Sequence, residues 1–318
     1  MRIGHNPARF VEKVDQPTEI LIGVVNFVPF LSGFYAQSLD VLKACLNSLQ
    51  VNTPEAHDLL VFDNHSCREV RDYLREAYEQ GLIQYLVLSD KNIGKLGAWN
   101  FMFGAAQSKY IAFSDSDVLY QKGWLAESLA LFKAFPKVGM VTARPYRTLM
   151  DYSSKTLEWA RQQPAGTLEQ GVLLEWDVYW EHARSLGYPL EKGQAEYRSG
   201  VDYRLTRAIN KAFIGAGHFQ FLAAADLLKQ ALPFASLQPM RGELALDAAV
   251  NEQGYLRLST AQPFVSHMGN TLPGSLPVGE AASRRKSFLR WVLWLPGIRH
   301  FLLWLNNRIF RLYFFNVD

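Results

Sequence analysis

The chain is poor in the features that define several classes of protein. Its 318 residues include only two cysteines, Cys45 and Cys67, which lack metal-ligand spacing. This excludes a disulfide framework and favours a reducing compartment. No apolar run approaches the roughly 18–20 residues that cross a bilayer. Charged residues interrupt the first part of the chain, so we expect no signal peptide and a cytoplasmic protein. We also find no internal repeat and no low-complexity tract.

The composition, with 49% hydrophobic and 20% charged residues, is typical of a globular protein. The length is sufficient for one large α/β domain with an extension. The net charge of +3 is unevenly distributed. Residues 281–318 hold seven Lys/Arg and one acid, which gives +6, so the preceding part has 26 basic and 29 acidic residues, or −3. A basic tail therefore follows a mildly acidic body.

Apolar runs alternate with helical periodicity through the first half of the chain. Leucines from Leu39 to Leu49 have helical spacing, and a capping box at Ser66–Glu69 is expected to open a helix that ends at Gly81. The runs expected to be strands are residues 19–28, 58–63, 83–88, 110–114 and 138–143. This alternation predicts an α/β fold with a doubly wound, mainly parallel sheet.

The alternation of strand and helix patterns is lost at the start of the second half. Residues 145–212 are rich in Trp, Tyr, Arg and Glu with weak periodicity, and we interpret them as a helical or irregular insertion that could act as a lid. Regular structure returns at 213–224, at a helix over 243–253 and in the strand YLRLS. We therefore divide the chain into an N-terminal segment (1–18), a catalytic domain (19–280) and a C-terminal amphipathic helical extension (281–318).

Three polar segments follow predicted strands: Asp63–Asn64, Asn92–Lys95 and Asp115–Asp117. In an open parallel sheet, ligands bind at the carboxyl ends of the strands, so these segments are expected to share one crevice. Two carboxylates spaced as in Asp115-Ser-Asp117 suit a hard divalent cation such as Mg²⁺ or Mn²⁺. The alternative is that Asp115 caps the next turn while Asp117 is solvated.

Residues 92–117, NIGKLGAWNFMFGAAQSKYIAFSDSD, resemble the central segment of family 2 glycosyltransferases with the A-type fold. The segment DLLVFDNHS is similar to the second strand of that family. The resemblance covers residues 19–143 well and 213–270 moderately. It implies a transferase that uses a nucleotide-diphosphate sugar with metal assistance and that inverts the anomeric centre.

Carried over by position, the resemblance assigns donor contacts to one set of residues: Asp63, Asn64, Asn92, Gly94, Lys95, Asn100 and Asp115. It assigns metal contacts to Asp115, Asp117 and His267, the last within the segment PFVSHMGN. Neutral imidazole is a better ligand for Mn²⁺ than for Mg²⁺. Solvation of Lys95, an ordinary helix position for Asn100 and a structural role for His267 remain open, and His218 is expected to be a packed core histidine.

An inverting transfer needs a carboxylate that accepts the proton of the attacking hydroxyl. In the family, an acidic pair stands about eleven residues before a Gly-Tyr. Counting back eleven residues from Gly254 leads to Glu243, and Gly242 stands where the first acid is expected. The candidates for the base are Glu243 and Asp247, each of which could equally be an exposed acid near a helix start.

The tail from 284 to 315 is rich in arginine and aromatic residues. This composition suits a helix lying at a membrane surface, here the inner face, although packing on protein or an oligomer face would use the same residues. Expected partners are a nucleotide-sugar donor and a glycan or lipid-linked acceptor, as in polysaccharide biosynthesis, without nucleic acid. The alternatives are a nucleotidyltransferase and a non-catalytic nucleotide-sugar-binding module.

Overall fold

The structure is a computed structural model that describes residues 4–163, 168–236 and 242–272, together with Phe301, Trp304, Leu305 and Arg308. The chain divides into two units, Met1–Pro273 and Gly274–Asp318. The first unit contains the sheet and the candidate site.

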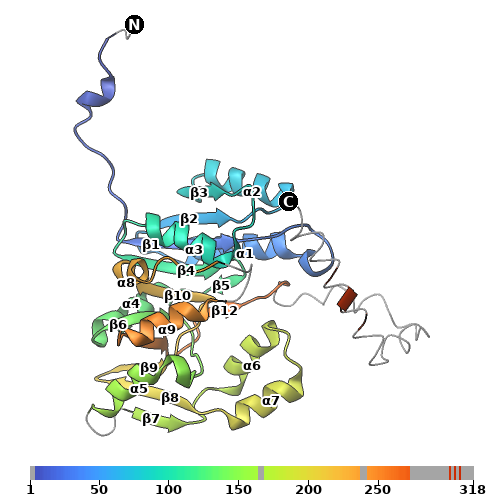
Figure 1. The fold of residues 1–318 in the computed structure, drawn as a ribbon, viewed down its shortest axis with the longest axis vertical. Coiled ribbons are helices and arrows are strands. Elements are labelled where there is room, and N and C mark those ends of the chain that lie inside the picture. Colours follow the sequence, from blue (N-terminus) through green and yellow to red (C-terminus); the bar gives the residue numbers. More distant parts are fainter. Residues whose placement is uncertain are drawn as a thin grey trace. The chain divides into compact units, whose positions relative to one another are not determined.

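A ten-stranded sheet forms the centre of the first unit, in the order β3-β2-β1-β4-β10-β6-β11-β9-β8-β7 (Figure 1). Seven strands point one way, and only β7, β9 and β10 run against them. This confirms the prediction of an α/β fold with a mainly parallel sheet. The strands are β1 (Ile20–Asn26), β2 (Asp58–Asp63), β3 (Tyr85–Leu88), β4 (Tyr110–Asp115), β6 (Val138–Thr142), β7 (Leu168–Gly171), β8 (Asp202–Arg207), β9 (Asn210–Ile214), β10 (Gln220–Ala224) and β11 (Leu256–Thr260).

A separate two-stranded sheet pairs β5 (Val118–Tyr120) with β12 (Val265–His267). The α-helices are α1 (Ser38–Asn52), α2 (Arg68–Glu79), α3 (Gly94–Ala105), α4 (Trp124–Ala134), α5 (Ser154–Arg161), α6 (Trp176–Ser185), α7 (Leu190–Ser199), α8 (Ala225–Gln230) and α9 (Leu244–Glu252). Short 3₁₀ turns occur at η1 (Pro7–Phe10), η2 (Gly33–Tyr35) and η3 (Met150–Tyr152).

Side-chain alternation along the strands separates two hydrophobic cores. In β1, Ile20 and Ile22 pack in the core formed with α1 and α2, whereas Leu21 packs in the core formed with α3, α8 and α9. Successive side chains of a strand point to opposite faces, so a strand apolar at every position must be covered on both. The result is a three-layer arrangement, with α3 and α9 in front of the strands in Figure 1.

One local expectation was wrong, and another was incomplete. Helix α2 begins after Cys67 without a side-chain cap, because the Ser66 hydroxyl accepts hydrogen bonds from Val28 N and Asn26 Nδ2 instead. Residues 145–212 also contain more regular structure than their weak periodicity indicates. Three helices form there, and β7 and β8 extend the sheet by antiparallel pairing.

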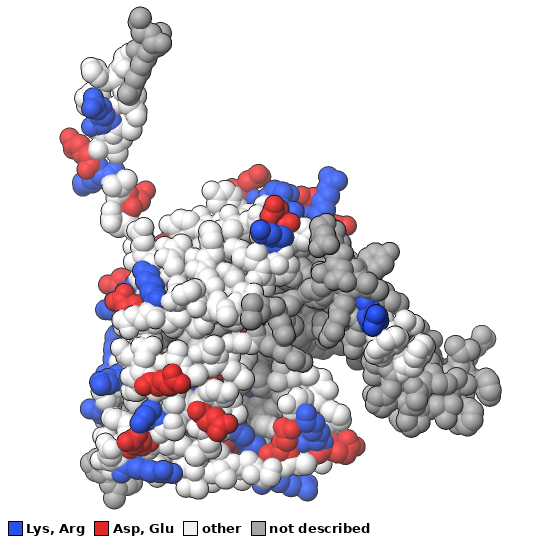
Figure 2. All heavy atoms as spheres, viewed as in Figure 1, with Lys and Arg blue, Asp and Glu red and all other residues white. Residues whose placement is uncertain are grey.

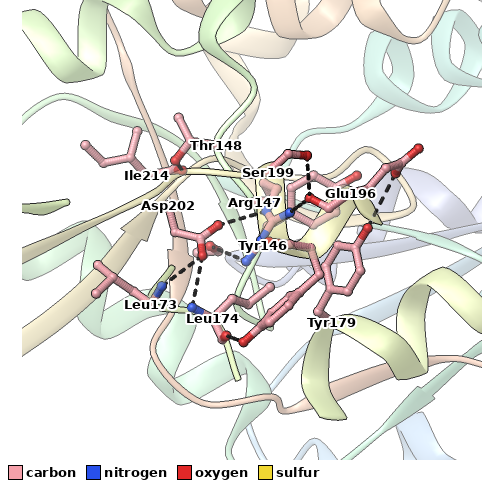
Figure 3. Close-up of polar contacts among 12 residues, drawn as sticks. Tyr146, Arg147, Thr148, Leu173, Leu174, Tyr179, Glu196, Ser199, Asp202 and Ile214 are labelled. Atoms are coloured by element: carbon pink, nitrogen blue, oxygen red, sulfur yellow. Dashed lines mark hydrogen bonds and ion pairs between the residues drawn. The ribbon is translucent and has the colours of Figure 1, made fainter. Parts of the chain in front are cut away.

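Helices α6 and α7 form a hairpin. The ion pair between Arg147 and Asp202, which is largely buried, connects this hairpin to the sheet (Figure 3). Arg147 Nε contacts Asp202 Oδ1 at 3.0 Å, and the other carboxylate oxygen accepts hydrogen bonds from the N–H groups of Leu173 and Leu174. The same guanidinium donates to the Glu196 and Tyr197 carbonyls of α7. One arginine thus joins the start of β8 to the end of α7.

Acidic and basic side chains are interspersed on the face shown in Figure 2, and neither sign gathers there among the described residues. In the tail, Phe301, Trp304 and Leu305 are helical and exposed, and the Arg308 guanidinium lies 5.5 Å from the centre of the Trp304 ring. The rest of the segment from 284 to 315 lies outside the described residues. No helix within the described ranges is long and apolar enough to cross a membrane.

The Arg147–Asp202 pair predicts a large stability effect. Replacing Asp202 with Ala removes the carboxylate that pairs with Arg147 and that accepts from the N–H groups of Leu173 and Leu174, so we expect the unfolding free energy to fall by about 3–5 kcal/mol in denaturant titrations. Glu169→Ala is the control, since its ion pair with Arg204 is partly exposed and should contribute at most about 1 kcal/mol. Equal losses in the two variants would contradict the assignment.

Candidate active site at the carboxyl edge of the sheet

The carboxyl ends of β1, β2 and β4 bring three polar residues to adjacent positions. Asn26 is paired with Asp63 across β1 and β2, and Val25 is paired with Asp115 across β1 and β4. Because these strands are parallel neighbours, the loops that follow them emerge at the same edge. The predicted convergence of the polar segments is therefore present in the fold.

Asp63 forms the base of this edge and is fully buried. Asn26 Nδ2 donates to its Oδ1 at 3.1 Å, and Ser66 N donates to its Oδ2 at 3.0 Å. A buried carboxylate needs such donors, because unpaired burial of charge is costly. Asn26 and Ser66 were not identified from the sequence, although a lone Asn in the apolar run EILIGVVNFV is a recognisable signal.

The next layer is a set of amide contacts that fixes the loop entering α3. Asn64 Nδ2 donates to Asn92 Oδ1 at 2.9 Å, and Asn64 Oδ1 accepts from Ile93 N at 2.8 Å. Gly94 N also donates to Asn92 Oδ1, with Gly94 at a φ of 74° that favours glycine. The structure thus joins Asn64, Asn92 and Gly94 as the sequence predicted.

Lys95, in the first turn of α3, pairs with Asp115 at the end of β4. Its Nζ lies 2.6 Å from Asp115 Oδ1 and 2.7 Å from Oδ2, and the side chains are 14% and 27% exposed. The ammonium also lies 5.1 Å from the centre of the Phe113 ring. Burial raises the pKa of Asp115, and the nearby ammonium opposes that rise.

Asp117 directly precedes β5 of the small sheet and faces His267 at the end of β12. His267 Nε2 lies 3.3 Å from Asp117 Oδ2, and Met268 N donates to the Asp117 carbonyl at 2.8 Å. The other imidazole nitrogen, Nδ1, lies 2.9 Å from the Ser185 hydroxyl at the end of α6. Pairing of β5 with β12 therefore brings together two residues that are 150 positions apart in the sequence.

The protonation behaviour of this pair suits a cation site. Burial raises the pKa of Asp117 to about 6 and lowers the pKa of His267 to about 4. At neutral pH the carboxylate is therefore charged and the imidazole neutral, the forms that bind metals. Asp117 Oδ1 is buried and has no hydrogen-bond partner. The Asp115 carboxylate, the Asp117 carboxylate with its unpartnered oxygen and the neutral imidazole are suitable donors to a divalent cation.

The described residues nevertheless contain no cluster of three acidic, cysteine or histidine side chains arranged around one point. Asp115 is engaged by Lys95, whereas Asp117 is engaged by His267. The candidate ligands thus share an edge of the sheet but point to different partners.

The segment before Glu243 is held against α3. Asn100 Nδ2 donates to the Phe234 carbonyl, and Asn100 Oδ1 accepts from Phe234 N, both at 2.8 Å. The Ser236 hydroxyl donates to the Ile93 carbonyl at 2.7 Å. Both ends of the Asn100 amide are therefore engaged in positioning this segment, and its contact with a donor stays a prediction.

The two candidate bases differ in their surroundings. Asp247 is buried, with its Oδ1 2.6 Å from Arg257 Nη2, whereas Glu243 stands at the start of α9 with 9% of its surface exposed. Gly242 has a φ of 103°, and a Cβ there would lie 2.7 Å from Leu96 Cδ1. This conformation explains why no acid stands at that position. His218 is one-third exposed and faces Asp247 at 3.6 Å, so the expectation of a packed core histidine was wrong.

Comparison with known proteins agrees with this geometry. The family model for glycosyl transferase family 2 matches residues 34–187, which include Asp63, the α3 loop and both acids of β4–β5. This segment, just under half of the chain, is therefore a glycosyl transferase family 2 domain. It is 25% identical over 122 residues to an uncharacterised glycosyltransferase from Nostoc sp. strain PCC 7120, covering 38% of this chain and 37% of the relative.

Solved structures of glycosyltransferases have a similar fold. GalNAc-T7, in complex with UDP, GalNAc and Mn²⁺, gives a TM-score of 0.50 at 13% identity, covering 82% of this chain and 46% of that protein. A mannosyltransferase from Pyrobaculum calidifontis, in complex with GDP-Man and Mn²⁺, gives 0.45 at 14% identity, with coverages of 80% and 60%. The chain thus spans less than two thirds of the length of each of these proteins.

One buried residue of this family 2 domain carried no sequence signal. Arg144 is 1% exposed and donates to the Val178 carbonyl of α6 at 2.6 Å and to the Val265 carbonyl of β12 at 3.3 Å. Its pKa is lowered by burial, which the nearby Glu181 opposes. Arg144 therefore links the strand that carries His267 to the hairpin of α6 and α7.

The raised pKa of Asp117 predicts that Asp117→Asn stabilises the metal-free protein. The folded state binds the Asp117 proton more tightly than the unfolded state, so ionisation lowers stability as pH rises from about 4 to 6. At pH 8 we expect a gain of about 1–2 kcal/mol, below the full linkage value because the side chain is 27% exposed.

This gain should vanish near pH 3.5, where Asp117 is protonated in both states. Urea unfolding at the two pH values measures the difference. Asp151→Asn, at an exposed position, provides the control. A destabilised Asp117→Asn protein at pH 8 would contradict the assignment.

Proposed function

We propose that this protein transfers a sugar from a nucleotide-diphosphate donor to a hydroxyl acceptor, with a divalent cation and with inversion at the anomeric carbon. The observation that carries the proposal is the edge formed by Lys95, Asp115, Asp117 and His267, where a buried Asp117 oxygen lacks a partner. The family 2 match supports the same chemistry.

The donor would lie over the loop that enters α3. Asn64, Asn92 and Gly94 hold this loop in place, and α3 then starts at the carboxyl edge of β4. Helix N-termini favour phosphate groups because their N–H groups are unpaired and the helix dipole is positive there. Asp63, which accepts hydrogen bonds from Asn26 and Ser66, holds the end of β2 next to this loop. We propose that the nucleoside lies beside Asn64.

Asp117, His267 and Asp115 are the residues that would hold the cation. A bound Mg²⁺ or Mn²⁺ offsets the negative charge that develops on a leaving diphosphate. The chain's own contribution is to keep the Asp117 carboxylate charged, the His267 imidazole neutral and its Nδ1 oriented by Ser185. Such outer contacts fix the orientation of an imidazole ligand.

For the base we propose Glu243. Asp247 Oδ1 lies 2.6 Å from Arg257 Nη2 in the protein interior, so this carboxylate is already engaged by a buried cation. Among the described residues, no lysine or arginine forms an ion pair with Glu243, and the contacts of Ser236 and Asn100 position the segment that precedes it. Asp247 would then serve mainly to hold α9 against β11.

We place the acceptor, a glycan or lipid-linked hydroxyl, on the side of the α6–α7 hairpin. This hairpin borders β12 and would exclude water, which competes as an acceptor. The exposed Phe301, Trp304 and Leu305 of the tail suit contact with the inner face of a membrane. Membrane association and a role in polysaccharide synthesis remain proposals.

Donor binding can be tested by thermal shift with UDP-, GDP- and dTDP-linked sugars, each with and without Mn²⁺. A ligand at 100 times its Kd adds about 2.7 kcal/mol, which raises Tm by several degrees. We expect one nucleotide to stabilise the protein, and to do so only with the cation. Lack of any shift across the panel would contradict the proposed donor site.

The base assignment predicts that Glu243→Gln lowers kcat by about 10²–10⁴-fold while the donor Kd stays unchanged, because only proton transfer is lost. Initial rates of donor turnover and calorimetric donor binding measure the two quantities. Glu252→Gln, an exposed change at the other end of α9, should leave kcat unaltered. Full activity of the Glu243→Gln enzyme would overturn this assignment.

The Asp247→Asn variant distinguishes the role of Asp247 from that of Glu243. The change leaves Arg257 as a buried cation without its partner, so the unfolding free energy should fall by about 3–5 kcal/mol. If Asp247→Asn instead retained stability and lost kcat, Asp247 would be the base. Denaturant titration alongside the turnover assay distinguishes these outcomes.

A further inference from the structure

The two acids at the end of β4 are compensated in different ways. Lys95 Nζ is within 2.7 Å of both oxygens of Asp115, whereas Asp117 Oδ1 is buried without a partner. No other lysine or arginine forms an ion pair with either acid among residues 4–163, 168–236 and 242–272. One ammonium thus occupies the carboxylate that a cation shared by the two acids would need.

Lys95 lies at the carboxyl edge of the sheet and is not fully enclosed. It is in the first turn of α3, and 14% of its side chain is exposed. The aromatic rings of Trp99 and Phe113 flank it at 5.6 and 5.1 Å. A lysine has a flexible four-carbon stem and a compact charge that suits phosphate as well as carboxylate.

We propose that Lys95 is an exchangeable counter-ion that couples cation binding to nucleotide binding. It occupies Asp115 in the free protein and transfers to the donor diphosphate when cation and nucleotide bind together. This inference rests on the proposed function, because it takes a cation and a diphosphate as the ligands of the edge.

Electrostatics explains the coupling. A cation that binds alone must displace the ammonium from Asp115 and leave it near a second positive charge, without a new anion. When a diphosphate binds as well, the ammonium gains a charge-assisted hydrogen bond in exchange for the one that it loses. Cation affinity should therefore be low without nucleotide and increase with it, and by linkage the nucleotide affinity increases with the cation by the same factor.

The alternative is a fixed structural pair, in which Lys95 stays on Asp115 whether or not ligands are bound. A fixed pair would contribute to stability but would change cation affinity equally with and without nucleotide. The two interpretations therefore differ in the coupling between ligands and not in the effect on folding.

The test is a binding cycle on the full chain. Mn²⁺ affinity is measured by electron paramagnetic resonance or calorimetry, alone and with UDP or GDP, for wild type, Lys95→Gln, Lys95→Arg and Lys91→Gln. Lys91 is exposed and four positions away, so its variant has the same charge change without the contact. Circular dichroism and Tm establish that each protein is folded.

For Lys95→Gln we expect Mn²⁺ to bind at least about tenfold more tightly without nucleotide, because no ammonium competes for Asp115. The nucleotide should bind about tenfold more weakly at saturating Mn²⁺, because the diphosphate loses a charged donor. The Mn²⁺–nucleotide coupling should fall by at least about tenfold. Lys95→Arg and Lys91→Gln should remain within about threefold of wild type, since both keep a cation at position 95.

Unchanged Mn²⁺ affinity in Lys95→Gln, in a protein whose wild type binds Mn²⁺ with UDP or GDP, would overturn the exchange and leave the proposed function standing. Tighter Mn²⁺ binding with unaltered coupling would identify a fixed pair and overturn it as well. If neither Mn²⁺ nor either nucleotide binds to any of the four folded proteins, the proposed function itself fails, and this inference fails with it.

Discussion

The compensation of buried carboxylates at the end of β4 is the constraint on which the site depends. Burial raises the pKa of both Asp115 and Asp117. Asp115 is paired with Lys95, whereas Asp117 lies beside the neutral imidazole of His267. A fully neutralised pair would have no need of an external cation. A wholly uncompensated pair would make the fold costly. Here the compensation is partial. Lys95 pairs with Asp115, whereas one buried oxygen of Asp117 has no partner, and added positive charge there would lower the cost of its burial.

Parallel topology explains how residues from distant parts of the chain reach this edge. Asn26, Asp63 and Asp115 end three adjacent parallel strands, and the crossover connections between these strands bring α3 with Lys95 to the same side. His267 enters by a different route. The short antiparallel pairing of β5 with β12 places it opposite Val118, one residue beyond Asp117. The candidate ligands are thus divided between the main sheet and a small two-stranded sheet.

The fold and part of the site could be predicted from the sequence because both depend on local patterns. Continuous apolar runs indicate strands covered on both faces, and Asp115 and Asp117 follow such a run directly. Long-range choices were not predictable in this way. Ser66 looked like a helix cap but forms hydrogen bonds with Asn26 and Val28, and Asn100 contacts Phe234, 134 positions away. Side-chain partners of this kind are decided by tertiary packing, which local spacing does not encode.

Two arginines, Arg144 and Arg147, extend this argument to the α6–α7 hairpin. Arg147 joins Asp202 to the end of α7, and Arg144 joins α6 to β12 through two backbone carbonyls. A buried guanidinium without acceptors is costly, so each of these contacts resists separation of the elements that it connects. Ser185 adds a third connection, from α6 to the imidazole of His267. Displacement of α6 would therefore alter the orientation of His267 beside Asp117, because both Arg144 and Ser185 connect α6 to β12.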